Sequence, residues 1–302
     1  ISSKSVEPFR RSSITNTNTR IMYIISKTNN YKITTSHQNH FIIVFVCMGG
    51  TKSRMREFAI YMSKVLGMPI RGERPANMTK RSQRYAMYKV GPVLCVSHGI
   101  GIPSMTTLLQ EVIKLMSYAK AKDPIFFRIG TSGGLGIPPG SVVVSSFGLN
   151  GNLEKTYNVV SAFVCPCGDG FRIHSFTIPF QLEGVCDDFR TYIGGTMASD
   201  DFYRGQARLD GPFCDYTEAY KMAFLKTLEE EGVRNIEMEA TAFAAFTREA
   251  GIRAGIVCVT FLDRLLGDQV SRTNKWQKRP MVVVGRLIKK YIENKGNIII
   301  RP

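Results

Sequence analysis

The sequence predicts an α/β protein with a largely parallel sheet flanked by helices. Apolar runs of strand length alternate with segments whose apolar residues recur about every 3.6 positions. This alternation is typical of strands joined by helices that pack back onto a sheet. Neither an internal repeat nor a linker interrupts the pattern. We therefore expect a single domain over residues 41–302.

In the first half of this domain the expected elements are well separated. The run FIIVFVCMGG at 41–50 is apolar throughout and ends in two glycines, as a buried strand does. The segment 103–121 has apolar residues at helical spacing and Pro103 in its first turn, where a missing N–H costs nothing. The other elements expected here are a helix at 53–67 and strands at 84–91, 92–101, 124–134 and 141–148.

The second half begins with a loop-rich stretch, residues 151–200, that contains only short strand candidates. Two helices are then expected, at 218–232 and 236–251, because each has helical spacing and ends in a glycine. A strand at 255–262 and a last helix at 280–295 complete the pattern.

Composition limits the classes of function. The chain has 302 residues, of which 44% are hydrophobic and 21% charged, and this is ordinary for a globular protein. No apolar run approaches the roughly 18 residues of a membrane span, so we expect no membrane partner. The net charge of +16 raises the question of nucleic acid. Since no nucleic-acid-binding fingerprint accompanies it, a small anionic ligand, or plain solubility, explains the excess better.

The seven cysteines indicate a reducing compartment rather than a disulfide framework. Their number is odd, and most lie in apolar runs such as VLCVSHG, as buried free thiols do. Cys165 and Cys167 are separated by a single proline, which is not the spacing of a zinc knuckle. We therefore expect no metal site and a cytoplasmic location.

The segment 1–40 differs in composition from the rest of the chain. It is rich in Ser, Thr, Asn and Arg and poor in apolar residues. Such a composition cannot bury enough apolar surface to offset the entropy of ordering. We expect a divergent, disordered segment here rather than a targeting signal.

Three expected strand ends carry residues suited to binding an anion. Ligands of open α/β sheets sit at the carboxyl ends of the strands. The sequence 49–54, GGTKSR, joins a strand to a helix whose first N–H groups point outward. Arg128 stands inside an apolar strand that ends in glycines, and His98 precedes another glycine turn. Together these turns favour a phosphate site without naming a reaction.

Each of these features also has a purely structural interpretation. A glycine pair at a strand end is often only a turn. Arg128 has to meet either a phosphate or a buried acid, because an unpaired charge in the core is costly. His98 could equally be a core histidine. The chain has neither a P-loop nor a complete dinucleotide-binding fingerprint.

Five blocks of sequence carry a resemblance to a known family. These are VFVCMGGTKSRM, RYAMYKVGPVLCVSHGIGIPS, RIGTSGGLGIPPGSVV, DFYRGQARLDG and VRNIEMEATAFAA. In this order they closely resemble the uridine phosphorylases of animals, which belong to nucleoside phosphorylase family I. The resemblance implies a three-layer α/β/α sandwich with a mixed, partly barrel-like central sheet. It also implies reversible phosphorolysis of uridine by a homodimer, with deoxyuridine as a second candidate substrate.

The resemblance assigns the phosphate site to a glycine turn and three arginines. Guanidinium groups suit a dianion because each donates paired, charge-assisted hydrogen bonds. Arg84 matches the arginine that reaches into the neighbouring subunit's site. The implied phosphate-binding residues are Gly50, Arg54, Arg84, Arg128, Ile129, Gly130 and Thr131.

In GQAR, the resemblance implies a uracil-reading motif. Gln206 can both donate and accept, which suits the N3–H and O2 edge of uracil, and Arg208 can donate to O4. Donors aimed at a departing ring stabilise the charge that develops on it. We expect the two side chains on one side of an extended segment. The implied uracil-binding residues are Ser132, Gly133, Phe202, Gln206, Ala207 and Arg208, and Arg208, Gln206 and Arg128 carry catalysis.

The ribose is assigned by resemblance to Met238, Glu239 and His98. A carboxylate can accept from both ribose hydroxyls and stabilise a cationic ribosyl group. From the sequence alone, Glu239 would be a solvated helix acid and Met238 a core residue. No cofactor is implied, since inorganic phosphate is itself the nucleophile.

The sequence departs from the family in four places. Asn30 stands where relatives have a ribose-contacting histidine, and Ala207 replaces a common glycine. The stretch between Ser36 and Val44 and the segment after Gln269 are both shorter than in relatives. The change at Ala207 is mild if the backbone φ there is negative. Two alternatives stay open: a weak or inactive paralogue that binds uracil or uridine, and a phosphorylase of shifted specificity. Gln206 and Arg208 argue against a purine.

Overall fold

The computed structural model describes residues 44–70, 75–80, 84–157, 171–172, 189–270 and 275–294. The segment 1–40, with Asn30, lies outside these residues, as do Cys165 and Cys167. The expectation of one domain over 41–302 therefore stays a prediction for the whole range.

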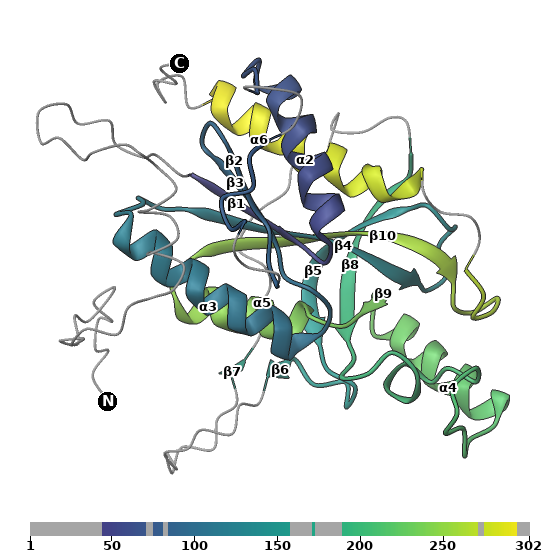
Figure 1. Ribbon diagram of the computed structural model, residues 1–302. Coiled ribbons are helices and arrows are strands. Elements are labelled where there is room, and N and C mark those ends of the chain that lie inside the picture. Colours follow the sequence, from purple (N-terminus) through teal and green to yellow (C-terminus); the bar gives the residue numbers. More distant parts are fainter. Residues whose placement is uncertain are drawn as a thin grey trace, which may run out of the picture.

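The centre of the molecule is a mixed sheet that closes partly on itself. Its strand order is β10-β5-β8-β9-β4-β1-β3-β2, and a further pairing joins β10 to β4. That pairing closes five strands into a ring, from which β1, β3 and β2 extend as an open sheet (Figure 1). The strands are β1 (Phe45–Gly49), β2 (Met87–Val90), β3 (Val93–Ser97), β4 (Ile125–Gly134), β5 (Val142–Leu149), β8 (Thr191–Ala198), β9 (Val233–Glu237) and β10 (Arg253–Asp263), with a separate pair, β6 (Thr156–Tyr157) and β7 (Phe171–Arg172).

The long strand β4 makes this closure possible. Its first half pairs in parallel with β1, and almost its whole length pairs in parallel with β10. At its end, Gly133 and Gly134 pair with β9 in the antiparallel sense. The absence of side chains at these glycines allows close approach, since a Cβ on Gly134 would lie 3.0 Å from the carbonyl oxygen of Leu262.

Helices cover the sheet on two sides, which confirms the expected three-layer fold. In Figure 1, α2 and α6 lie on one side of the sheet and α3 and α5 on the other, while α4 packs beside β9. The bounds are α2 (Lys52–Val65), α3 (Ile102–Tyr118), α4 (Glu218–Glu230), α5 (Ala240–Glu249) and α6 (Arg279–Asn294), with short 3₁₀ turns η1 (Arg204–Gln206) and η2 (Trp276–Lys278).

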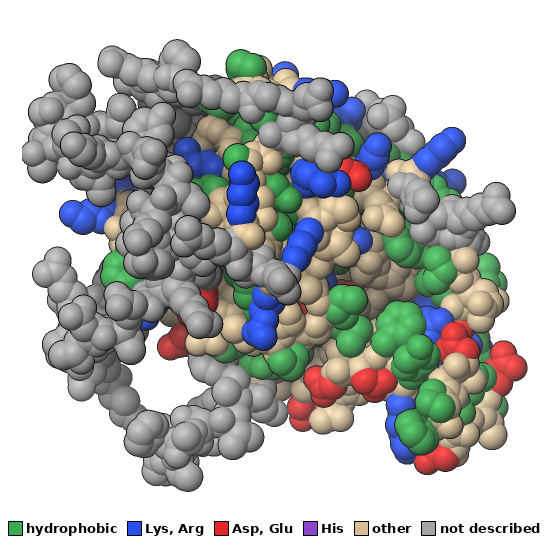
Figure 2. Space-filling model, in the orientation of Figure 1, with side chains coloured by type: hydrophobic (Ala, Val, Ile, Leu, Met, Phe, Trp, Pro, Cys, Tyr) green, Lys and Arg blue, Asp and Glu red, His purple; other side chains and the backbone are tan. Residues whose placement is uncertain are grey.

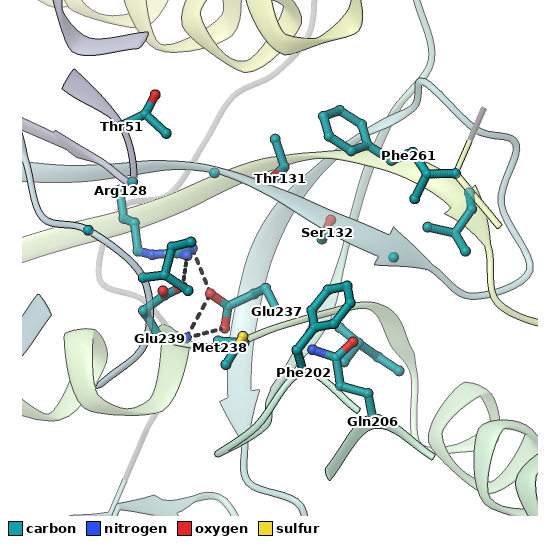
Figure 3. A pocket seen from close by; sticks show the side chains of 18 of the residues that line it. Thr51, Arg128, Thr131, Ser132, Phe202, Gln206, Glu237, Met238, Glu239 and Phe261 are labelled. Atoms are coloured by element: carbon teal, nitrogen blue, oxygen red, sulfur yellow. Dashed lines mark hydrogen bonds and ion pairs between the residues drawn. The ribbon is translucent and has the colours of Figure 1, made fainter. Parts of the chain in front are cut away.

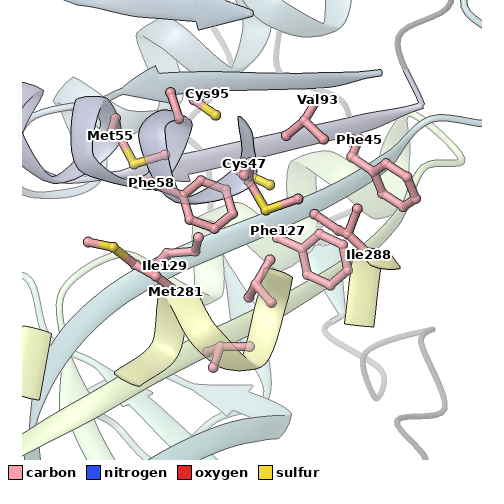
Figure 4. Packing of buried hydrophobic residues seen from close by; sticks show 14 of the residues in the cluster. Phe45, Cys47, Met55, Phe58, Val93, Cys95, Phe127, Ile129, Met281 and Ile288 are labelled. Carbon is pink, nitrogen blue, oxygen red and sulfur yellow. The ribbon is translucent and has the colours of Figure 1, made fainter. Parts of the chain in front are cut away.

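Apolar side chains fill the spaces between the layers. Under α2 and α6, Phe58, Met281 and Ile288 pack onto Phe45 and Phe127 of the sheet (Figure 4). A second cluster fills the space under α3 and α5. Of the described cysteines, Cys47, Cys95 and Cys258 are buried free thiols, as expected, and Cys214 is an exposed one. Burial raises the pKa of each of the three buried thiols.

One expected element was wrong at its start. The sequence predicted a helix over 236–251, but Ile236 and Glu237 belong to strand β9, and α5 begins only at Ala240. The side chain of Glu237 accepts hydrogen bonds from the backbone N–H groups of Glu239 and Ala240, which turns the chain between strand and helix. Tertiary pairing of β9 with β8 therefore overrides the local helical pattern.

The described part of the chain contains neither a membrane-spanning helix nor a cluster of metal-ligating side chains. No helix in it is long and apolar enough to cross a bilayer. No group of three or more His, Cys, Asp and Glu side chains in it is placed to hold a metal ion. On the face in Figure 2, Lys and Arg side chains stand apart from one another, and acidic side chains gather at the lower right, over the α4 region.

Candidate functional site

A cavity of about 310 Å³ opens where several strands end. The ends of β4, β9 and β10 contribute to it, together with the turns after β1, β3 and β8. In Figure 3, Thr131 and Ser132 lie between Arg128 on one side and Phe202 and Gln206 on the other. Of the sixteen predicted site residues, thirteen line this cavity: Gly50, Arg54, His98, Arg128, Gly130, Thr131, Ser132, Gly133, Phe202, Gln206, Arg208, Met238 and Glu239.

The turn after β1 forms one wall of the cavity. Thr51 caps α2, and its hydroxyl accepts a hydrogen bond from the backbone N–H of Arg54. The Gly50 carbonyl accepts from the N–H of Gly99, so the turns after β1 and β3 lie against each other. A Cβ on Gly50 would lie 3.1 Å from the Gly99 carbonyl oxygen. The close approach of these two backbone segments therefore favours glycine at position 50.

Arg128 lies between two buried carboxylates. Its Nη1 is 2.7 Å from Oε2 of Glu237, and its Nη2 donates to Oε2 of Glu239 (Figure 3). Burial alone would lower the pKa of Arg128, but the charges of Glu237 and Glu239 raise it overall. The sequence left open whether Arg128 meets a phosphate or a buried acid, and the structure shows that it pairs with buried acids. Arg128 also lines the cavity.

The two carboxyl groups beside Arg128 titrate differently. Burial raises the pKa of Glu237 to about 7. The pKa of Glu239 is lowered, because the charge of Arg128 and a hydrogen bond from the Gly101 N–H outweigh the effect of burial. That bond measures 2.6 Å. Glu237 is thus the first of the pair to take up a proton, while Glu239 stays ionised.

Sequence reasoning missed Glu237. Its signal was present, because a buried arginine needs a carboxylate and the motif IEME offers two acids at a spacing of two residues. Glu239 is also not the solvated helix acid that the pattern alone suggested. Only 4% of its surface is exposed.

At the opposite end of the cavity lie Gln206 and Arg208, although the segment between them is not extended as expected. Residues Arg204–Gln206 form a 3₁₀ turn, and Ala207 follows with φ 51° in the left-handed region. This reversal brings both flanking side chains to the cavity and turns Ala207 away from it. Alanine in place of the family's glycine would be a mild change only at a negative φ, and the φ of Ala207 is positive.

Arg208 is held on three sides. Its Nε and Nη2 donate to the two oxygens of Asp210 at 2.9 Å each, and Nη2 also donates to the Asp268 carbonyl at 2.7 Å. Its guanidinium carbon lies 4.5 Å from the centre of the Phe202 ring. The hydrogen bonds to Asp210 raise the pKa of Arg208. A fixed cation of this kind presents a donor to a ligand with little further ordering.

Arg264 is a second arginine at this end, and sequence reasoning missed it. It is fully buried at the end of β10, and its Nε donates to Asp268 at 2.8 Å. Asp268 also pairs with Lys221 of α4 at 2.7 Å. Nη1 of Arg264 has no hydrogen-bond partner among the described residues. The run FLDR at the end of a strand was the available signal.

His98 lies near Arg128 and Glu239, and its ring makes no hydrogen bond to a described residue. Only 1% of its surface is exposed, and neither ring nitrogen has a hydrogen-bond partner within the described chain. Burial lowers the pKa of His98 to about 3, and the charges of Arg128 and Arg54 add to this effect. The imidazole is therefore neutral.

The nitrogens left without partners mark an anion site. Besides His98, the Nε atoms of Arg54 and Arg128 are buried and lack hydrogen-bond partners in the described part of the chain. Burial lowers the pKa of Arg54, and the nearby charge of Arg128 lowers it further. Buried N–H groups of two guanidinium side chains, left without acceptors, favour binding of an oxyanion.

Three of the predicted residues do not line the cavity. The Ile129 side chain packs into the core, so only its main chain is available to a ligand. The Ala207 side chain is buried outside the cavity lining. Arg84 is exposed outside the cavity, where its guanidinium carbon lies 6.0 Å from the centre of the Tyr85 ring. Its expected role in a neighbouring subunit stays a prediction.

Comparisons with known proteins agree with this geometry. The family model "Phosphorylase superfamily" matches residues 44–289. The chain is 41% identical to uridine phosphorylase 1 of Mus musculus, covering 82% of this chain and 81% of the relative. It is 43% identical to the uridine and thymidine phosphorylase of Caenorhabditis elegans, covering 82% and 83%.

Two further similarities bear on activity and fold. A uridine phosphorylase structure from Phytophthora capsici superimposes with a TM-score of 0.77 at 38% identity, covering 86% of this chain and 91% of that one. The chain is also 35% identical to the inactive uridine phosphorylase B of Schistosoma mansoni, covering 86% and 87%.

Proposed function

This chain belongs to the phosphorylase superfamily, and we infer from its cavity that it is a uridine phosphorylase. It is a pentosyltransferase that moves the ribosyl group of uridine from uracil to inorganic phosphate, reversibly. The products of the forward reaction are uracil and ribose 1-phosphate. Deoxyuridine is proposed as a second substrate.

The observation that carries this function is the shared cavity. Arg54 and Arg128 line one end of it, and Gln206 and Arg208 line the other. A phosphate and a nucleobase bound at these two ends would leave the ribose between them, beside Met238 and Glu239. The site can therefore hold all the reacting groups at once, which is the main requirement for a displacement at the anomeric carbon.

The chemistry follows from the order of these groups. A phosphate oxygen attacks C1′ of the ribose as the C1′–N1 bond to uracil breaks, and the bonding electron pair passes to the uracil ring. Glu239, which is ionised, stabilises positive charge on the ribosyl group. Gln206 and Arg208 donate to the ring as it becomes negative, so they bind the transition state more strongly than the substrate.

The individual residue roles are part of this proposal. Gly50, Arg54, Arg128, Gly130 and Thr131 bind phosphate, with the main chain of Ile129. Ser132, Gly133, Phe202, Gln206 and Arg208 bind uracil, and Met238 and Glu239 bind ribose. No metal or organic cofactor takes part.

The assembly and setting are proposed on the same basis. We expect a homodimer in which each subunit lends Arg84 to its partner's site. The enzyme would act in the cytoplasm, in pyrimidine salvage, without a nucleic-acid or membrane partner.

Phosphate-dependent release of uracil from uridine tests the proposal. The expected result is turnover with uridine that requires inorganic phosphate, followed by the change in ultraviolet absorbance. An intact protein that binds uracil without turnover would instead be a non-catalytic paralogue, as the similarity to an inactive relative allows. Turnover of inosine but not uridine would indicate shifted specificity.

A further inference from the structure

His98 has a fixed place in the cavity wall. It follows β3, and its backbone N–H donates to the Gly49 carbonyl at 2.8 Å. Its own carbonyl accepts from the hydroxyl of Ser104 at 2.6 Å. The peptide group of Gly99 lies beside the ring, outside hydrogen-bond geometry. The main chain is thus held at both sides. The imidazole lines the cavity, and neither of its nitrogens has a hydrogen-bond partner in the described part of the chain.

The surroundings of the ring contain more donors than acceptors. The charged groups that act on His98 are Arg128, Arg54 and Glu239. Of these, Glu239 already accepts from the Gly101 N–H and from Arg128. Arg54 and Arg128 each keep an Nε without a partner among the described residues. A ligand that satisfies these groups must therefore bring several acceptor oxygens.

Inorganic phosphate has that character, whereas a ribose hydroxyl brings one oxygen and one donor of its own. The turn that carries His98 also lies directly on the Gly50 turn, through the bond from Gly99 N–H to the Gly50 carbonyl. A neutral imidazole offers one N–H donor and adds no further positive charge beside two guanidinium groups.

We propose that His98 donates a hydrogen bond to the phosphate co-substrate as a neutral side chain, alongside Arg54 and Arg128. This rests on the proposed function and moves His98 to the phosphate from the ribose, to which the family resemblance had assigned it. His98 would then add a phosphate-binding side chain from the turn after β3 to those from α2 and β4, and it would not act as a general acid.

The test compares binding of inorganic phosphate to the full-length apo-enzyme by calorimetry. His98→Leu keeps a side chain of similar size without a donor, and His98→Asn keeps an N–H. We expect His98→Leu to bind phosphate about tenfold more weakly or worse, and His98→Asn to recover part of the loss. Ser104→Ala is the matched control, because it loosens the same turn without lining the cavity, and it should bind phosphate as the wild type does.

Steady-state kinetics separate phosphate from ribose. The KM for phosphate should rise in His98→Leu, and the KM for uridine should change less than threefold. Unchanged phosphate binding with a raised KM for uridine would overturn the proposal and return His98 to the ribose. An equal loss in Ser104→Ala would assign the effect to the turn and also overturn it.

A second measurement applies if His98→Leu does not fold. Nitrogen NMR of the histidine side chains is then recorded on the wild type with and without phosphate. Phosphate should shift one His98 nitrogen resonance while the ring stays neutral. No shift would contradict the proposal. A wild type that binds phosphate but does not cleave uridine would refute the proposed function, while the comparison of phosphate affinities would still decide the role of His98.

Discussion

Arg264 Nη2 donates a hydrogen bond of 2.7 Å to the main-chain carbonyl of Gln206. These residues are 58 positions apart, at the end of β10 and in the turn after β8. The fully buried guanidinium therefore fixes the turn that aims Gln206 and Arg208 at the cavity. Asp268 ties the same group together, since its carboxylate binds Arg264 and its carbonyl accepts from Arg208.

The first prediction concerns Asp268. Asp268→Asn leaves the buried charges of Arg264 and Lys221 without their counter-charge, which should lower the free energy of unfolding by about 3–5 kcal/mol. The kcat/KM for uridine should fall as well, because the turn loses its support. Urea denaturation and steady-state kinetics measure the two effects. Asp215→Asn is the control: its ion pair with Arg204 is exposed, so we expect a change of about 0.5 kcal/mol or less.

The second prediction concerns Arg208. Arg208→Ala should lower kcat/KM by more than a hundredfold, corresponding to about 3 kcal/mol of transition-state stabilisation. Arg204→Ala, in the same turn but exposed, should keep kcat/KM close to the wild-type value. An unaffected rate in Arg208→Ala would remove this residue from the mechanism.

The third prediction is a pH dependence due to Glu237. The pKa of Glu237 is about 7 in the folded protein and about 4.5 in the unfolded chain. Between pH 4.5 and 7, the folded state therefore keeps a proton that the unfolded state has lost. The contribution of Glu237 to the free energy of unfolding is therefore present at low pH and declines as pH rises from 4.5 to 7, by at most about 3 kcal/mol.

Glu237→Gln isolates this contribution because Gln does not titrate. The wild type minus Glu237→Gln difference in unfolding free energy should decrease between pH 4.5 and 7 and level off above that range. Urea denaturation at several pH values measures it, and the other titrating groups cancel in the difference. A difference that grows with pH would mean that Glu237 is ionised throughout.

The fourth prediction concerns backbone strain at Ala207. A non-glycine residue in the left-handed region costs about 1 kcal/mol or more, and part of this is recovered by glycine. We expect Ala207→Gly to raise the free energy of unfolding by about 0.5–1 kcal/mol, with kcat/KM nearly unchanged. Ala223→Gly on α4 is the opposite control, since glycine inside a helix should destabilise the protein by about 1 kcal/mol.

Much of the fold followed from local patterns. The continuous apolar runs that became β1, β4 and β10 predicted buried strands, and the helical spacing of α2, α3 and α6 predicted their helices. Local reasoning was wrong at Ile236 and Glu237, where pairing with a distant strand decided the conformation. It was wrong again at Gln206–Arg208, because a left-handed residue between two polar ones leaves no signal in hydrophobic spacing.

By itself, the sequence determined the α/β class, the glycine turns at the strand ends and the residue types suited to an oxyanion and a uracil ring. Only the tertiary structure decided that Arg128 pairs with two acids and that Arg264 supports Gln206. It also decided that both ring nitrogens of His98 lack a partner among the described residues. The physical reason is that spacing along the chain reports which face a residue occupies. The partner of a buried charge is set by strands that meet only when the sheet closes on itself.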